Sequence, residues 1–137
     1  MIWLRVTGIA AAFALCALLV SAPASATLDT AIGQRSVVPG KPFSDCSAKA
    51  DRALTTVMQN ATEAGPGSGN WFGAVSTGGA PSEIAIVECH PQGDGYAVSF
   101  TCSVQVPPSP DTAAALCTKV IAAFGAASTA ATGGAGW

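Results

Sequence analysis

Charged residues are scarce in this 137-residue chain, at 10% of the sequence, and histidine occurs only once, as His90. Six basic residues stand against eight acidic ones, so the chain has neither the basic patch that nucleic acid requires nor a cationic stripe for anionic lipid. A C-x-x-C pair is absent, and so is a glycine-rich loop ending in Lys-Ser or Lys-Thr. We therefore predict no metal site, no cofactor and no nucleic-acid partner.

Residues 1–26 have the pattern of a cleaved export signal. Arg5 precedes an apolar stretch from Ile9 to Val20, and the Ala-Ser-Ala that ends at residue 26 fits the rule for signal peptidase. A retained membrane anchor is the alternative, but the uncharged segment is short for the ~20 residues of a spanning helix. We expect a secreted or periplasmic protein, without stable membrane insertion after cleavage and without Cys16.

The strongest secondary-structure pattern lies between Glu83 and Val106. From Tyr96 to Val106 apolar residues alternate with small or polar ones, which is the period of a half-buried strand. The run from Ile84 to Cys89 is also apolar, but its alternation is weaker, so both of its faces look partly covered. Between the two runs, the stretch Pro-Gln-Gly-Asp-Gly supplies turn residues. A β-hairpin that turns at Gly93-Asp94 is predicted.

Four cysteines follow residue 26, and an even number in a small exported chain predicts two disulfides. The hairpin register keeps Cys89 and Cys102 ~13 Å apart along the ladder, beyond the ~7 Å that a disulfide spans. Cys102 lies ~13 Å from the end of its strand, and Cys117 lies ~10 Å along the returning helix. We therefore predict Cys102–Cys117 and Cys46–Cys89, with the nested pairing of Cys46 with Cys117 and Cys89 with Cys102 as the alternative.

Two helices are predicted on either side of the hairpin. Apolar residues at helical spacing follow Ser44, a candidate N-cap, and the glycines from Gly65 end this first helix. Ser109 is the candidate N-cap of a second helix that stops at Gly125. Trp71 to Ser76 could add a third strand. The predicted fold is α+β in the order α-β-β-(β)-α, a small antiparallel sheet of two or three strands with two helices on one face, braced by two disulfides.

This single α+β domain occupies residues 43–125. Residues 27–42 lack sustained periodicity and are predicted as an extended lead-in, with at most a short edge strand at Val37-Val38. Residues 126–137 are small and uncharged, so we predict a flexible low-complexity tail.

The sequence leaves the function open between three classes. We favour a small binding or inhibitor-type module that presents a braced surface to another protein, either Trp71-Phe72 or the turn with His90, Asp94 and Tyr96. For the aromatic pair itself, core packing is favoured over exposure as a contact patch, since large aromatics are usually mostly buried. A secreted hydrolase that uses His90 as base is the second class, although no motif sets a nucleophile beside it. A passive envelope or surface component is the third.

Overall fold

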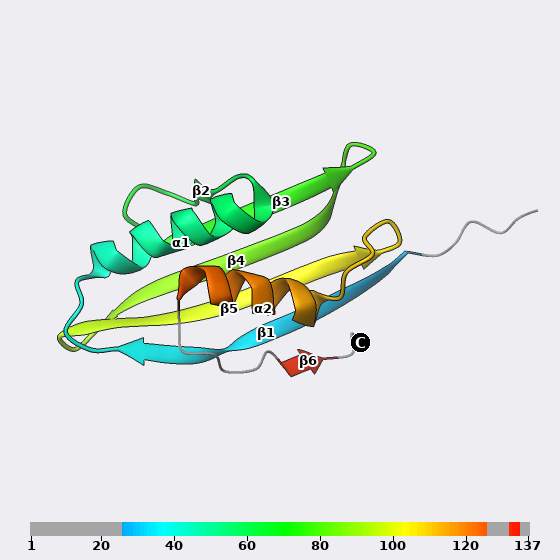
Figure 1. Ribbon diagram of the computed structural model, residues 1–137. Coiled ribbons are helices and arrows are strands. Elements are labelled where there is room, and N and C mark those ends of the chain that lie inside the picture. Colours follow the sequence, from blue (N-terminus) through cyan, green and yellow to red (C-terminus); the bar gives the residue numbers. More distant parts are fainter. Residues whose placement is uncertain (1–25, 126–131, 135–137) are drawn as a thin grey trace, which may run out of the picture.

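An antiparallel sheet with two helices on one face makes up the described part of the chain, residues 26–125 and 132–134 of a computed structural model (Figure 1). The sheet has six strands in the order β2-β3-β4-β5-β1-β6. The predicted α+β class, with an antiparallel sheet, two helices and two disulfides, is confirmed. The elements in chain order are β1 (Thr27–Val38), α1 (Phe43–Met58), β2 (Thr62–Glu63), β3 (Asn70–Thr77), β4 (Ala80–Gln92), β5 (Gly95–Val106), α2 (Ala113–Phe124) and β6 (Thr132–Gly134).

Several predictions made for the two ends of the chain fall outside this part. Residues 1–25 of the expected signal peptide are not among the described residues, nor are residues 126–131 and 135–137 of the expected tail. The remaining tail residues, Thr132–Gly134, pair with β1 as strand β6. Neither α1 nor α2, the two helices of the described ranges, has the length and apolar composition of a membrane-spanning helix.

The prediction of two or three strands is wrong, because the sheet has six. The hairpin of β4 and β5 has the expected register, with Cys89 opposite Val98 and Ala85 opposite Cys102. The expected third strand is present as β3. The main addition is β1, which covers most of the expected lead-in and pairs with β5 along nearly its whole length. Strand β1 pairs with a strand that is distant in the sequence, so no local turn signal predicts this pairing.

On strand β1 the larger apolar side chains lie mostly on the side away from the helices, because helix α2 packs closely against the other side. Asp29 Oδ2 accepts a hydrogen bond from the backbone N–H of Ala113, 2.8 Å away at the start of α2. A Cβ atom on Gly33 would lie only 2.9 Å from Cδ1 of Ile121. The side of β1 that faces the helices therefore holds small and polar residues, and its apolar residues Leu28 and Ile32 point the other way.

The two predicted N-caps are both incorrect. Helix α1 already includes Ser44 in its first turn and has no side-chain cap. In α2 the cap is Thr112, whose hydroxyl accepts from the N–H of Ala115 at 3.2 Å. The Ser109 hydroxyl instead donates to Glu83 Oε1 at 2.6 Å. This hydrogen bond holds the segment before α2 against β4. Helix initiation here follows tertiary contacts as well as capping preference.

The helix ends differ from each other in how well the sequence predicts them. Gly125 ends α2 as expected, in the left-handed conformation with φ 78°. Helix α1 ends at Met58, earlier than expected, because Gln59 takes φ 62° and Asn60 turns to the sheet. The Asn60 side chain donates to the carbonyl of Ala74 at 2.6 Å and accepts from its N–H at 2.9 Å, in the manner of an added strand residue.

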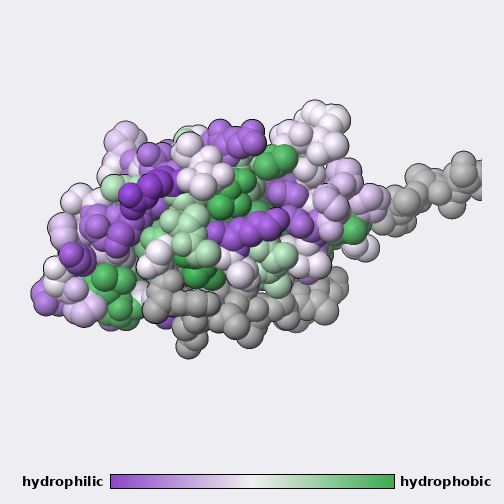
Figure 2. Space-filling model, in the orientation of Figure 1, coloured by the Kyte–Doolittle hydropathy of each residue, from purple (hydrophilic) through white to green (hydrophobic). Residues whose placement is uncertain are grey.

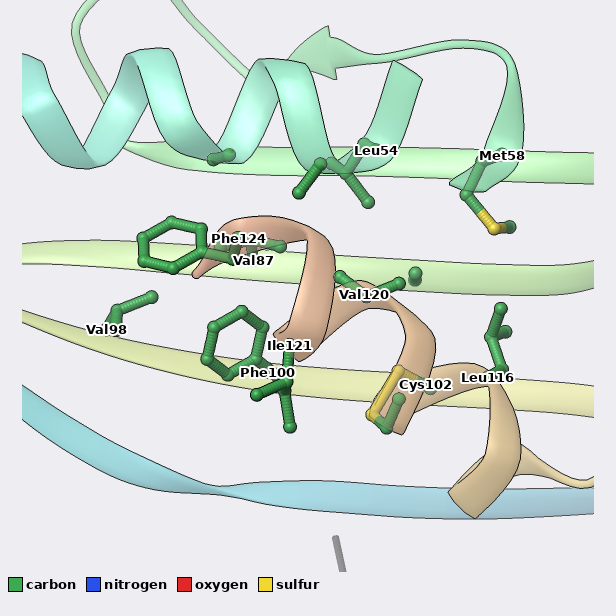
Figure 3. Packing of buried hydrophobic residues seen from close by; sticks show 14 of the residues in the cluster. Leu54, Met58, Val87, Val98, Phe100, Cys102, Leu116, Val120, Ile121 and Phe124 are labelled. Carbon is green, nitrogen blue, oxygen red and sulfur yellow. A yellow bond between two sulfur atoms is a disulfide. The ribbon is translucent and has the colours of Figure 1, made fainter. Parts of the chain in front are cut away.

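The hydrophobic core lies between the helices and the sheet (Figure 3). Phe100 of β5 meets Phe124 of α2 edge to face, with ring centroids 5.3 Å apart. Leu54 of α1 and Val120 of α2 point into the same cluster. Each such fully buried side chain contributes ~1.5–3 kcal/mol to folding.

Each helix is also joined to the sheet by one disulfide. Cys46 of α1 is bonded to Cys89 of β4, with Cα atoms 6.0 Å apart. Cys102 of β5 is bonded to Cys117 of α2, with Cα atoms 5.5 Å apart. This is the pairing favoured over the nested alternative. The four bonded cysteines are all buried. With two disulfides, the protein is a small disulfide-braced module of the kind found in oxidising compartments.

Candidate functional site: the uncovered face of the sheet

The face of the sheet opposite the helices is the candidate site. Figure 2 views the helix side, where hydrophilic residues gather mainly over α1, while the surface of α2 is largely apolar or neutral. On the opposite side, no helix or strand from the described ranges covers the four long strands. We call this side the uncovered face; its residues include Leu28, Thr30 and Ile32 of β1, Phe72 and Ala74 of β3, Ile84, Ile86 and Glu88 of β4, and Ser99, Thr101 and Ser103 of β5.

Strand register places four of these residues in a single row across the sheet. Phe72 pairs with Ile86, Ile86 with Thr101, and Thr101 with Ile32. We call these four residues the central row. Neighbouring side chains in such a row are ~4.5–5.5 Å apart at Cβ. The row is therefore a continuous strip with an aromatic residue at one end, aliphatic residues within it and one hydroxyl.

The apolar residues on this face are unusually accessible. Leu28 is 65% exposed, Ile32 is 59% exposed and Phe72 is 41% exposed. An antiparallel sheet with one solvated face usually places polar residues on it. Single exposed apolar residues are common, but a contiguous group on one face is typical of an interaction site.

Two shallow hollows lie on the uncovered face, one on each side of Ile84. The first, of about 220 Å³, is lined by apolar surface around Phe72 and Ile86 and is bordered by Ala64. The second, of about 150 Å³, lies beside Leu28 and is bordered by Ser103. Each could accept one apolar side chain of a partner.

Charge is nearly absent from the centre of this face. Glu88 lies beyond the central row, and its Oε2 accepts a hydrogen bond from the Ser99 hydroxyl at 3.2 Å. The Thr30 and Ser103 hydroxyls are 3.4 Å apart and satisfy each other. The centre of the face can therefore be desolvated without stranding a charge.

The aromatic pair predicted from sequence is divided between the two faces of the sheet. Trp71 is half-buried on the helix side and packs against the core. The glycines on the same side of the chain, Gly69 and Gly73, let α1 pack close to the sheet beside Trp71. A Cβ atom on Gly73 would be 2.9 Å from Cβ of Met58. Phe72 points to the uncovered face. The prediction of core packing therefore holds for Trp71, and the prediction of an exposed aromatic residue holds for Phe72.

The three candidates near the hairpin turn are not brought into one site. His90 is exposed near the end of β4, on the uncovered face and opposite Ala97. Asp94 is exposed in the turn itself. Tyr96 is buried on the helix side, and its hydroxyl donates to Asp45 Oδ2 at 2.9 Å. The Tyr96 side chain thus contributes to the fold rather than to an accessible surface.

The Asp45 carboxylate also forms an ion pair with Lys49, at 2.9 Å. Hydrogen bonds from Lys49 and then from Tyr96 lower the pKa of Asp45. The same contact with Asp45 raises the pKa of Lys49. Burial, together with the bond to Asp45, raises the pKa of Tyr96. This network holds the first turn of α1 against β5 with its groups in their ordinary charge states at neutral pH.

Sequence reasoning missed Leu28 and Ile32, the most exposed apolar residues of the face. The available signal was the alternation of Leu28, Thr30 and Ile32 with smaller or polar residues. That alternation is hard to recognise because the inward side of β1 carries small or polar residues, such as Asp29, Ala31 and Gly33, along most of its length. Within residues 26–125 and 132–134, no group of three or more His, Cys, Asp or Glu side chains is placed to hold a metal ion.

Comparison with models of protein families, with curated proteins and with solved structures gave no match. The functional argument therefore depends on the geometry of the uncovered face.

Proposed function

We propose that this protein is an exported, non-enzymatic binding module that holds a protein surface against the uncovered face of its sheet. The observation that carries the proposal is the group of exposed apolar side chains on this face, led by Leu28, Ile32 and Phe72. Leaving them in water costs ~25 cal/mol per Å² of apolar area that a partner could cover. The helices and disulfides on the other side keep the sheet rigid, so little conformational entropy is lost on binding.

The shape and chemistry of the face define the partner surface. The hollows on either side of Ile84 suit two apolar side chains. The hydroxyls of Thr101 and Ser103 suit an uncharged polar contact between them. A charged group placed on the central row would lose its hydration without gaining an ionic partner. The partner surface is therefore apolar and uncharged at its centre.

Export is part of this proposal. Its support is the expected signal sequence at residues 1–26 and the two buried disulfides, which form and persist in oxidising compartments. Secretion and delivery to a periplasm agree equally with both features.

Hydrolysis at His90 is a weaker proposal. The imidazole shares the uncovered face with Ser99 and Glu88, but the Ser99 hydroxyl donates to Glu88. A serine nucleophile would instead have to donate its proton to the imidazole. The geometry supports a binding surface more directly than a catalytic one.

The test is affinity capture from the extracellular and periplasmic fractions of the producing cells, with the oxidised mature protein as bait. We expect one or more captured proteins to be lost with Phe72→Glu and with Ile32→Glu. Thr55→Glu, an exposed site on α1, is the matched control and should capture normally. Equal capture by all three variants would show that the uncovered face is not the binding surface.

A further inference from the structure

We propose that the uncovered face binds the same face of a second copy of this chain, so that two sheets pack face to face between outer layers of helices. This inference rests on the proposed function and names the partner of that site. A second copy presents the partner surface defined above, namely an apolar surface that is uncharged at its centre and has hydroxyls beside it.

The central row makes the face complementary to itself. A two-fold axis parallel to the strands, between β4 and β5, places β1 of one copy over β3 of the other. Because the four residues lie at one level of the sheet, Ile32 of each copy then lies over Phe72 of its partner, and Thr101 over Ile86. Two aligned sheets pack ~10 Å apart, a distance that side chains of this size fill. Both contacts occur twice, as a closed two-fold dimer requires.

The size of the face is close to the lower limit for a specific, reversible pair. Four strands ~4.8 Å apart, each contributing ~8 residues at ~3.3 Å, cover ~500 Å² per copy. The pair therefore buries ~1,000 Å², which is the lower limit for a specific interface. This area includes Glu88, two residues from the central row, whose carboxylate accepts a hydrogen bond from Ser99 of its own copy. The formal net charge is −2 for the full chain, and loss of Arg5 with the expected signal makes it 5 − 8 = −3, which adds little repulsion between copies.

The β3 edge of the sheet is less suited to self-assembly than the face. Strand β2 covers part of this edge but has only two residues. The next position along β3, Ala74, has both its N–H and its C=O bonded to the Asn60 side chain. Short edge strands and side-chain caps of this kind oppose edge-to-edge pairing. The uncovered face is thus the more favourable surface for a second copy.

The first experiment measures the mass of the oxidised mature protein by sedimentation over a range of concentrations. We expect a monomer–dimer equilibrium, with a dissociation constant raised ~100-fold or more by Ile32→Glu or Phe72→Glu, since each dimer would bury two unpaired carboxylates. Thr55→Glu should leave the constant unchanged. A monomeric mass at every concentration overturns the second-copy proposal.

The second experiment tests the predicted axis. Copies carrying Ile32→Cys are mixed with copies carrying Phe72→Cys and treated with a short bismaleimide cross-linker. We expect a covalent dimer that joins position 32 of one copy to position 72 of the other, and none when either variant is treated alone. Cross-linking of each variant to itself as readily as in the mixture would contradict the arrangement. If the wild type is monomeric but its capture of other proteins still depends on Phe72, the proposed function stands and the second-copy inference fails. If the wild type is monomeric and its capture of other proteins does not depend on Phe72, both fail.

Discussion

Removing the two disulfides separately should destabilise the protein by different amounts, because they close loops of different length. Cys102 and Cys117 are 15 residues apart, whereas Cys46 and Cys89 are 43 apart. The chain-entropy relation predicts a cost of ~3 kcal/mol for the shorter loop and ~4 kcal/mol for the longer one. All four sulfur atoms belong to buried residues, so the packing lost on replacement by alanine is similar in both pairs. The difference of ~1 kcal/mol then reflects the loops.

The assay is equilibrium unfolding of Cys102→Ala/Cys117→Ala and of Cys46→Ala/Cys89→Ala in guanidinium chloride. Free energies extrapolated to water are compared rather than midpoints, since a missing cross-link expands the unfolded state and changes the slope. A total of ~5–15 kcal/mol is usual for a domain, so either variant should lose a large part of its stability. Wild-type stability in either variant, or a larger loss for the shorter loop, would refute the reasoning.

Two further predictions concern single positions near the hairpin turn. Gly95→Ala should destabilise the fold by more than ~2 kcal/mol in denaturant unfolding, because its Cβ would overlap the backbone carbonyl of Val38, which cannot move aside as a flexible side chain can. Gly93→Ala, with φ 59° and open space around it, should cost only ~1–2 kcal/mol, and equal costs would contradict the packing of β1 on β5. Tyr96→Phe should cost ~1.5 kcal/mol near neutral pH, the lower end for a hydrogen bond to a charged group, since Asp45 is partly exposed. The hydrogen bonds from Lys49 and Tyr96 lower the folded-state pKa of Asp45. Their contribution to the free energy of unfolding is therefore present above about pH 4 and is lost as the pH falls through the lowered pKa. The difference between wild type and Tyr96→Phe in urea unfolding should therefore shrink at acid pH, and a gap that widens would be inconsistent with this account.

The sequence by itself determined the parts of the fold that depend on local pattern. Alternation from Tyr96 to Val106 and the turn at Gly93-Asp94 predicted the β4–β5 hairpin with its register. That register excluded a Cys89–Cys102 bond and favoured the pairing present in the structure. The hairpin register follows from chain geometry over a few residues, which the sequence displays directly, and Cys46–Cys89 then follows by elimination.

Tertiary structure decided the width of the sheet and the location of the candidate site. Strand β1 meets β5 across dozens of residues, and the residues on its inward side are small because α2 packs against them, so its pattern resembles that of a loop. Trp71 and Phe72 are adjacent in sequence, yet the pleat sends them to opposite faces, one under α1 and the other to the uncovered face. Which face of a strand is covered depends on where the helices pack, and that is settled only when contacts between distant segments form.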